Sequence, residues 1–163
     1  MSRATDRIVE VCAIEVDDDF NEIDSFHAFI NPQRKVPWFV TRIHGLNNEF
    51  LDDKPIFSDI GRDLLLFLEG SELWAHNMSF DAGMLNAEFA RNRLPTLEKV
   101  DCRLNCTLQL ARSTFPGQKN SLDALLDRFA IDRSERRLHG AMIDTRLLVK
   151  VYQNLVSYRT KTS

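Results

Sequence analysis

The alternation of apolar and polar residues predicts strands at the beginning of the chain. Residues 8–16 (IVEVCAIEV) are almost continuously apolar and rich in β-branched side chains. Such a run is typical of a strand that is buried on both faces. A run of three aspartates then predicts a turn, and residues 25–30 (SFHAFI) alternate in polarity as a second strand does. Residues 31–42, which contain two prolines, predict a loop.

After Pro55 the apolar residues recur with the spacing of a helix. Proline is a residue type that suits the first turn of a helix. The apolar side chains of one face then recur at helical spacing: Ile56, Ile60, Leu64 and Phe67. Gly70 follows the helix, and residues 72–75 (ELWA) predict a short strand. Ser79 is the expected N-cap of the next helix. This second helix carries three apolar residues: Met84, Leu85 and Phe89.

The remaining third of the chain alternates in the same way. Residues 99–102 predict a short strand and residues 104–115 a helix, which Pro116 and Gly117 end. Ser121 is expected to cap a short helix, and the last helix is expected over residues 140–156. Its inward face is predicted from four residues: Leu147, Leu148, Val151 and Leu155. Strands followed by alternating helices and short strands indicate an α/β fold with a mixed sheet flanked by helices.

Composition and charge set limits on this picture. A chain of 163 residues with 44% hydrophobic content is the size of one domain, here residues 1–156 with a free tail over 157–163. The net charge of −3 argues against a protein held to duplex DNA mainly by charge, so nucleic acid would bind in a local site. No apolar run approaches the length of a membrane span. Polar residues 1–7 predict no secretory signal.

The three cysteines are expected to be reduced thiols of a cytosolic protein. Cys102 and Cys106 have a spacing that zinc sites use, but no second pair completes four ligands.

Two segments carry candidate chemistry, HNMSFD at residues 76–81 and HGAMID at residues 139–144. Each opens a predicted helix, and the first follows a predicted strand, where α/β proteins place ligands. Taken alone, Asp81 could interact with a helix dipole, Asp144 could be solvated and His139 could belong to a loop. The presence of both segments in this order favours a functional site.

HNMSFDAGML resembles the second motif of the DEDDh-type 3′–5′ exonuclease family, and HGAMIDTRLL resembles the third. Other stretches are similar to the epsilon (proofreading) subunits of bacterial DNA polymerase III within that family. These stretches are DRIVEVCAIEV, RIHGLNNEFLDDKPIF and ARSTFPGQKNSLDALLDRFAID. The similarity spans roughly residues 6–155, so residues 1–156 are interpreted as an exonuclease domain with a ribonuclease H-like fold.

The resemblance also implies the chemistry. In this family two Mg²⁺ or Mn²⁺ ions, about 3.5–4 Å apart, stabilise the attacking and leaving oxygens of a phosphodiester. By resemblance, Asp81 and Asp144 are metal ligands, His139 is the general base and His76 orients the backbone around Asp81. Three further residues are expected to bind substrate: His44, Asn77 and Phe80.

The chain departs from the family at its first motif. It contains no Asp-x-Glu pair, and residues 1–6 (MSRATD) have no apolar run. Two of the four metal carboxylates and the first central strand are therefore expected to be missing. Cys106 and Phe39 also stand where relatives carry acids. Three explanations fit: a start read too far downstream, a truncation, or a second copy of the chain that fills the gap.

We therefore expect a metal-dependent 3′–5′ exonuclease of the proofreading type, with weakened metal binding and impaired activity. The expected partners are single-stranded DNA 3′ ends and the catalytic subunit of DNA polymerase III, and the expected location is the cytoplasm. The alternative is an inactive exonuclease-like module that binds polymerase or single-stranded nucleic acid. A third possibility is a fragment that aggregates through exposed strand edges.

Overall fold

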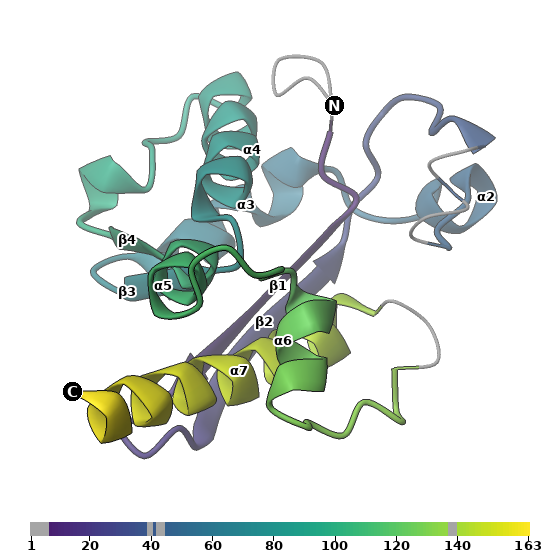
Figure 1. Cartoon of the computed structure of the whole chain (residues 1–163). Helices are drawn as coiled ribbons and strands as arrows, with labels where there is room; N and C mark the ends of the chain where they lie inside the picture. Colours follow the sequence, from purple (N-terminus) through teal and green to yellow (C-terminus); the bar gives the residue numbers. More distant parts are fainter. Residues whose placement is uncertain (1–6, 39–40, 42–44, 137–139) are drawn as a thin grey trace.

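A computed structural model describes residues 7–38, 41, 45–136 and 140–163 (Figure 1). These residues form an α/β fold, as the sequence predicts. The elements in chain order are β1 (Glu10–Val16), β2 (Glu22–Phe29), α2 (Asn48–Leu51), α3 (Phe57–Leu68), β3 (Glu72–Ala75), α4 (Met78–Arg91), the 3₁₀ helix η1 (Glu98–Val100), β4 (Arg103–Cys106), α5 (Thr107–Thr114), α6 (Leu122–Arg128) and α7 (Ala141–Thr162).

The strands form two separate two-stranded sheets. β1 pairs with β2 in antiparallel orientation, with Glu10 opposite Phe29. β3 pairs with β4 in parallel orientation, with Glu72 opposite Arg103. The prediction of one mixed sheet is therefore wrong for the described residues. Both orientations occur, but among these residues no strand joins β1 to β3 through backbone hydrogen bonds.

β1 lies between two layers of helices. Figure 1 shows α7 running along one side of β1 and β2, while α3 and α4 lie on the other side. Because successive side chains of a strand point to opposite faces, Val11 and Ala13 pack against the core on the α3 and α4 side. On the other face, the Cys12 Sγ atom lies 3.5 Å from Met142 Sδ on α7. β1 thus packs on both faces, but the prediction of a strand buried on both faces is wrong in degree, because its residues are half-buried and Glu15 is exposed.

Two hydrophobic clusters stabilise these layers. The first joins α3 and α4 to the strands, and its buried members are Ile30, Phe57, Leu64, Leu65, Leu68, Met78, Ala82, Phe89, Leu97 and Cys102. The second joins α5, α6 and α7, and its buried members are Ala111, Phe115, Leu125, Leu126, Leu147, Val151 and Leu155. The inward positions predicted for α7 are thus confirmed at three of four residues.

The inward face of α3 differs from the prediction. Leu64 is fully buried, as expected, but its buried companions include Phe57 and Leu68. Ile60 and Phe67 pack against the same cluster while keeping partial exposure. The helix begins at Phe57 rather than Pro55, because the Asp59 carboxylate accepts a hydrogen bond from the Ile56 backbone N–H at 3.2 Å.

The segment between α4 and α5 was also predicted out of register. The strand lies at Arg103–Cys106 instead of residues 99–102, and α5 begins at Thr107 instead of residue 104. In the parallel pairing, Leu104 stands opposite Leu73. Leu104, which was predicted to lie in a helix, is therefore a strand residue, and it packs against the first cluster. Short apolar runs carry too little periodicity to separate these alternatives.

Helix α7 extends to Thr162, six residues beyond the predicted end at residue 156. These residues are not a free tail, because the Tyr158 ring lies 4.9 Å from that of Phe115. The Arg159 guanidinium also donates a hydrogen bond to Ser113 Oγ at 2.9 Å. Within the described ranges, no helix combines the length and apolar character that a membrane span requires.

A buried carboxylate ties the beginning of the described chain to α4. Glu88 is only 1% exposed. It accepts two hydrogen bonds from Arg7, at 2.7 and 3.1 Å, and one from the Ile8 backbone N–H at 3.3 Å. Arg91, one turn further along α4, lies 3.2 Å from the same carboxylate. A buried charge of this kind depends on all of its partners.

We predict that Glu88→Gln lowers the free energy of unfolding by about 2 kcal/mol, because two arginines lose their counter-charge. The loss stays below the roughly 3–5 kcal/mol typical of fully buried pairs because both arginines keep some solvent access. Urea unfolding, monitored by circular dichroism, measures this loss of unfolding free energy. The control is Asp53→Asn, which removes an exposed pair with Lys54 and should cost less than about 0.5 kcal/mol. Equal losses in the two variants would contradict this interpretation.

Candidate active site

The first candidate segment forms the junction between β3 and α4. Asn77 is the residue before the helix, and its backbone has a φ of 75° in the left-handed region. Its carbonyl accepts the Phe80 backbone N–H at 3.0 Å. A non-glycine residue in this region costs about 1–2 kcal/mol and is common at functional sites. The predicted N-cap at Ser79 is wrong: Ser79 lies within α4, and its hydroxyl donates to Asn77 Oδ1 at 3.3 Å.

Asp81 lies in the first turn of α4 and is exposed. Desolvation by the surrounding protein nevertheless raises the pKa of its carboxyl to about 6, although a hydrogen bond from its own backbone N–H opposes the shift. Among the described residues, none forms an ion pair with this carboxylate. Asp81 is therefore an acid in a partly desolvated position, and no described residue pairs with it as a cation.

His76 holds this junction in place and does not point to solvent. Its Nδ1 atom lies 2.9 Å from Thr107 Oγ1, and its Nε2 atom lies 2.8 Å from the Asn120 carbonyl. Because a carbonyl only accepts, Nε2 carries the proton, and Nδ1 accepts from the threonine hydroxyl. Desolvation is the main cause that lowers the pKa of His76, and nearby Arg112 adds to it, while the bond to Asn120 opposes it. The neutral ring thus joins β3 to the α5–α6 connection.

Cys106 lies where two helices begin. Its Sγ atom accepts the Met78 backbone N–H at 3.4 Å. Desolvation alone would raise the pKa of this thiol, but backbone N–H groups of both helix starts outweigh it, and the pKa lies below its usual value. The residues that supply these groups are Gln109, Met78, Asn77 and Leu108. Cys106 therefore occupies an anion-favouring position beside the Asp81 helix.

Asp144 lies in the first turn of α7 and is paired with a guanidinium. Its Oδ1 atom is 2.7 Å from Arg136 Nε, and its Oδ2 atom accepts from Arg136 Nη2 at 3.5 Å. Arg136 also pairs with Asp123, which lies in the first turn of α6. The second candidate acid is thus bound by a guanidinium.

The divalent cations that the resemblance implies would need several oxygen or nitrogen ligands. Within residues 7–38, 41, 45–136 and 140–163, no three His, Cys, Asp or Glu side chains lie close enough to hold a metal ion. Asp81 belongs to no such group there, and Asp144 is engaged by Arg136. This arrangement does not fit a two-metal centre. Phe39, His44 and His139 lie outside the described residues.

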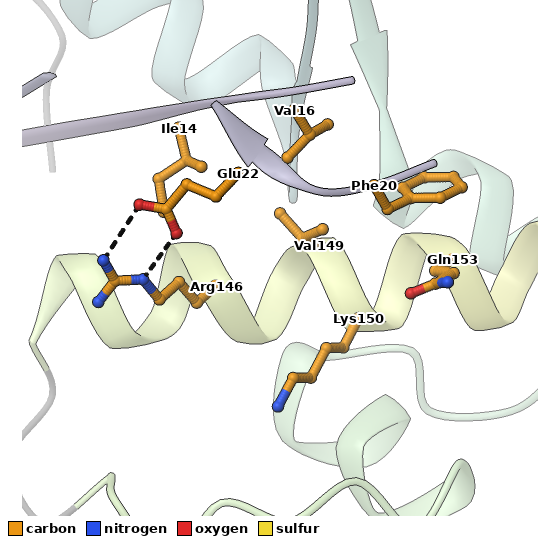
Figure 2. Close-up of a pocket in the computed structure, with 8 residues that line it drawn as sticks. All are labelled: Ile14, Val16, Phe20, Glu22, Arg146, Val149, Lys150 and Gln153. Carbon is orange, nitrogen blue, oxygen red and sulfur yellow. Dashed lines mark hydrogen bonds and ion pairs between the residues drawn. The ribbon is translucent and has the colours of Figure 1, made fainter. Parts of the chain in front are cut away.

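A groove elsewhere on the surface is separate from these residues. It has a volume of about 270 Å³ and lies between α7 and the β1–β2 turn (Figure 2). Figure 2 shows the ion pair at one end of it, in which Arg146 donates to both carboxylate oxygens of Glu22, at 3.0 and 3.1 Å. Of the predicted site residues that the structure describes, none lines this groove.

Sequence reasoning did not identify Arg136, Thr107 or Asn120 as partners of the candidate residues. Thr107 and Asn120 are both buried polar residues, at 0% and 7% exposure. Their roles depend on contacts over 31 and 44 positions of the chain, which no local pattern reveals. The only signal for Arg136 is a run of basic residues before His139.

Residues 1–152 match the family described as RNase T, exonuclease. The DNA polymerase III subunit epsilon of Rickettsia conorii is 45% identical over 159 residues, which cover 94% of this chain and 67% of that protein. The epsilon subunit of Pasteurella multocida is 38% identical and also covers 94% of this chain. The chain spans 60% of the length of that relative.

Solved structures of exonucleases share the fold. Exonuclease X in complex with 5′ overhanging duplex DNA is 26% identical, with a TM-score of 0.67, and the match covers 92% of this chain and 82% of that one. The nuclease domain of 3′hExo, a DEDDh family member bound to rAMP, has a TM-score of 0.75 at 14% identity, covering 93% of this chain and 81% of that one. These likenesses bear out the predicted exonuclease fold.

The His76 network predicts a pH dependence of stability. Because the pKa of His76 is lowered on folding, the unfolded chain binds a proton more readily, and stability falls as the pH drops below about 6.5. His76→Gln removes this titration, so the difference in unfolding free energy between wild type and variant should narrow from pH 7.5 to pH 5.5. Urea unfolding across this range measures the difference. A constant difference, or an NMR titration that places the His76 pKa above 6.5, would refute the assignment.

Proposed function

Because the chain belongs to the RNase T exonuclease family, we propose that it is the exonuclease domain of a DNA polymerase III epsilon-like protein. It would remove nucleotides from DNA 3′ ends in proofreading. The observation that carries the proposal is the identity of 38–45% to epsilon subunits over nearly the whole chain. The complex of exonuclease X with duplex DNA supports DNA as the substrate class.

The proposed roles of the residues follow the two motifs. Asp81 and Asp144 would be the acids for divalent cations, and His139 the general base that takes a proton from the attacking water. The exposed, partly desolvated Asp81 at the start of α4 suits such a role. Three further residues would bind the 3′-terminal nucleotide: His44, Asn77 and Phe80. Asn77 and Phe80 are within one turn of Asp81, which supports a shared surface.

We also propose that this chain acts slowly. It contains no Asp-x-Glu pair, and its described residues supply neither the first central strand nor a group of three metal-ligating side chains. Arg136 further competes for the Asp144 carboxylate. Two divalent cations would therefore bind weakly, and the negative charge that develops on the reacting phosphate would be poorly neutralised.

The proposed partners are single-stranded DNA 3′ ends and the catalytic subunit of DNA polymerase III, and the proposed location is the cytoplasm. The epsilon relatives are named as subunits of that polymerase, which supports the second partner. The alternative function is an inactive exonuclease-like module that binds polymerase or single-stranded nucleic acid. The observation in its favour is that Asp144 is held by Arg136.

Digestion of a 5′-labelled single-stranded oligonucleotide with Mn²⁺ tests the proposal. We predict shortening from the 3′ end that is abolished in His139→Ala, because the general base is lost. The rate should lie at least about 100-fold below that of the Rickettsia conorii epsilon subunit under the same conditions, because metal carboxylates are missing.

The matched control is His27→Ala, which removes a histidine that lies on β2 beside Glu10 and outside the candidate segments. It should digest as the wild type does. If no shortening occurs while the oligonucleotide is still bound, the inactive module is the better account. A rate equal to that of the epsilon subunit would instead refute the proposed impairment.

A further inference from the structure

The groove between α7 and the β1–β2 turn has an apolar floor. Ile14, Val16 and Phe20 come from the two strands and their turn, and Val149 comes from α7 (Figure 2). All four residues are only half-buried, so the groove leaves apolar surface in contact with water. The Phe20 ring packs edge-on against Tyr152 of α7, with the ring centroids 5.7 Å apart, which fixes that end of the floor. Covering such a surface with a partner is favourable.

The hairpin side of the groove is acidic. Residues 15–24 (EVDDDFNEID) contain six acids and no base. Asp17 shapes the turn itself, because its carboxylate accepts the backbone N–H groups of Asp19 and Asn21, both at 2.9 Å. Asp18 and Asp19 are exposed, and neither carboxylate forms an ion pair with a described residue. These two charges are therefore available to a partner.

The helix side of the groove is basic. After Asp144, helix α7 carries no acid and four cations, which are Arg146, Lys150, Arg159 and Lys161. Lys150 lines the groove, is exposed and forms no ion pair with a described residue. Figure 2 shows its side chain extending from α7 away from Val16 and Phe20. Arg146 already pairs with Glu22 of β2 within the chain, so the charges of the two sides attract each other.

An apolar strip between an acidic side and a basic side is complementary to itself. When a twofold axis passes through such a surface, the acidic side of one copy faces the basic side of the other, and the two apolar floors meet. A peptide of one charge sign would be attracted by one side and repelled by the other. The charge pattern therefore favours a second copy of this chain as the occupant.

We propose that the chain forms a weak twofold dimer through this groove, in which Lys150 of each copy faces the Asp18–Asp19 turn of the other. Because no described candidate site residue lines the groove, the inference goes beyond the proposed function and does not depend on it. A groove of about 270 Å³ suits a small, transient interface, so dimerisation should depend on protein concentration. Because its charges are exposed, dimerisation should also weaken as salt is added.

Sedimentation equilibrium of the whole chain across a range of protein concentrations tests the proposal. The wild type should show a monomer–dimer equilibrium. Lys150→Glu should weaken dimerisation at least about tenfold, because the twofold axis creates two like-charge contacts in every dimer. Asp18→Lys should weaken it to a similar extent, since its two new lysines then face Lys150 of the opposite copy.

An equimolar mixture of the two variants separates a twofold dimer from other occupants. In the mixed dimer, the acid introduced at position 150 faces the lysine introduced at position 18. The unaltered Asp18 and Lys150 face each other at the second contact. Mixed dimers should therefore form with an affinity within about threefold of that of the wild type.

The matched control is Lys99→Glu, which changes the net charge as Lys150→Glu does. Lys99 is an exposed residue of η1 and does not line the groove. This variant should dimerise as the wild type does. Circular dichroism checks the folding of every variant.

A wild type that stays monomeric at every concentration would overturn the proposal. So would a mixture that dimerises no better than the separate variants, or an equal loss in Lys99→Glu and Lys150→Glu. If a charge variant does not fold, the salt dependence of the wild type decides. Dimerisation that weakens at least about threefold between about 0.05 and about 0.5 M NaCl supports the proposal, and an unchanged or stronger dimer refutes it.

Discussion

The described structure depends on the buried carboxylate of Glu88. The sheet of β1 and β2 shares no backbone hydrogen bonds with the sheet of β3 and β4 among the described residues, so side chains must hold the two together. Glu88 does this on α4 by binding Arg7 and the Ile8 backbone just before β1. Apolar packing of Val11 and Ala13 against the first hydrophobic cluster also contributes to this attachment, without a preferred direction. The position of α4, and with it the Asp81 segment, therefore follows from one buried ion pair and the core around it.

Much of the fold could be predicted from the pattern of the sequence, and the failures have physical causes. The strand at Glu72–Ala75 and the Ser121 cap of α6 are confirmed, because a short apolar run and a capping hydroxyl are strong local signals. The strand at Arg103–Cys106 was misplaced because its pairing with β3 is a long-range interaction that overrides local periodicity. The end of α7 was missed because Tyr158 is held by Phe115, a contact from another helix.

The candidate site was predicted in part. The sequence placed Asp81 and Asp144 at the starts of two helices, and the structure bears this out. It could not show that desolvation raises the pKa of Asp81 or that Arg136 takes the Asp144 carboxylate. Both features arise from residues brought together by packing. Among the described residues, no three metal-ligating side chains gather around the two candidate acids.

The most direct test of this account is a crystal structure of the chain grown with Mn²⁺, with the ion located by its anomalous diffraction. The account predicts that Arg136 remains on Asp144 at low Mn²⁺ concentration, and that no pair of ions is bound jointly by Asp81 and Asp144. Two strong anomalous peaks about 3.5–4 Å apart, coordinated by both aspartates, would contradict it, because they would show a complete two-metal centre without the Asp-x-Glu pair.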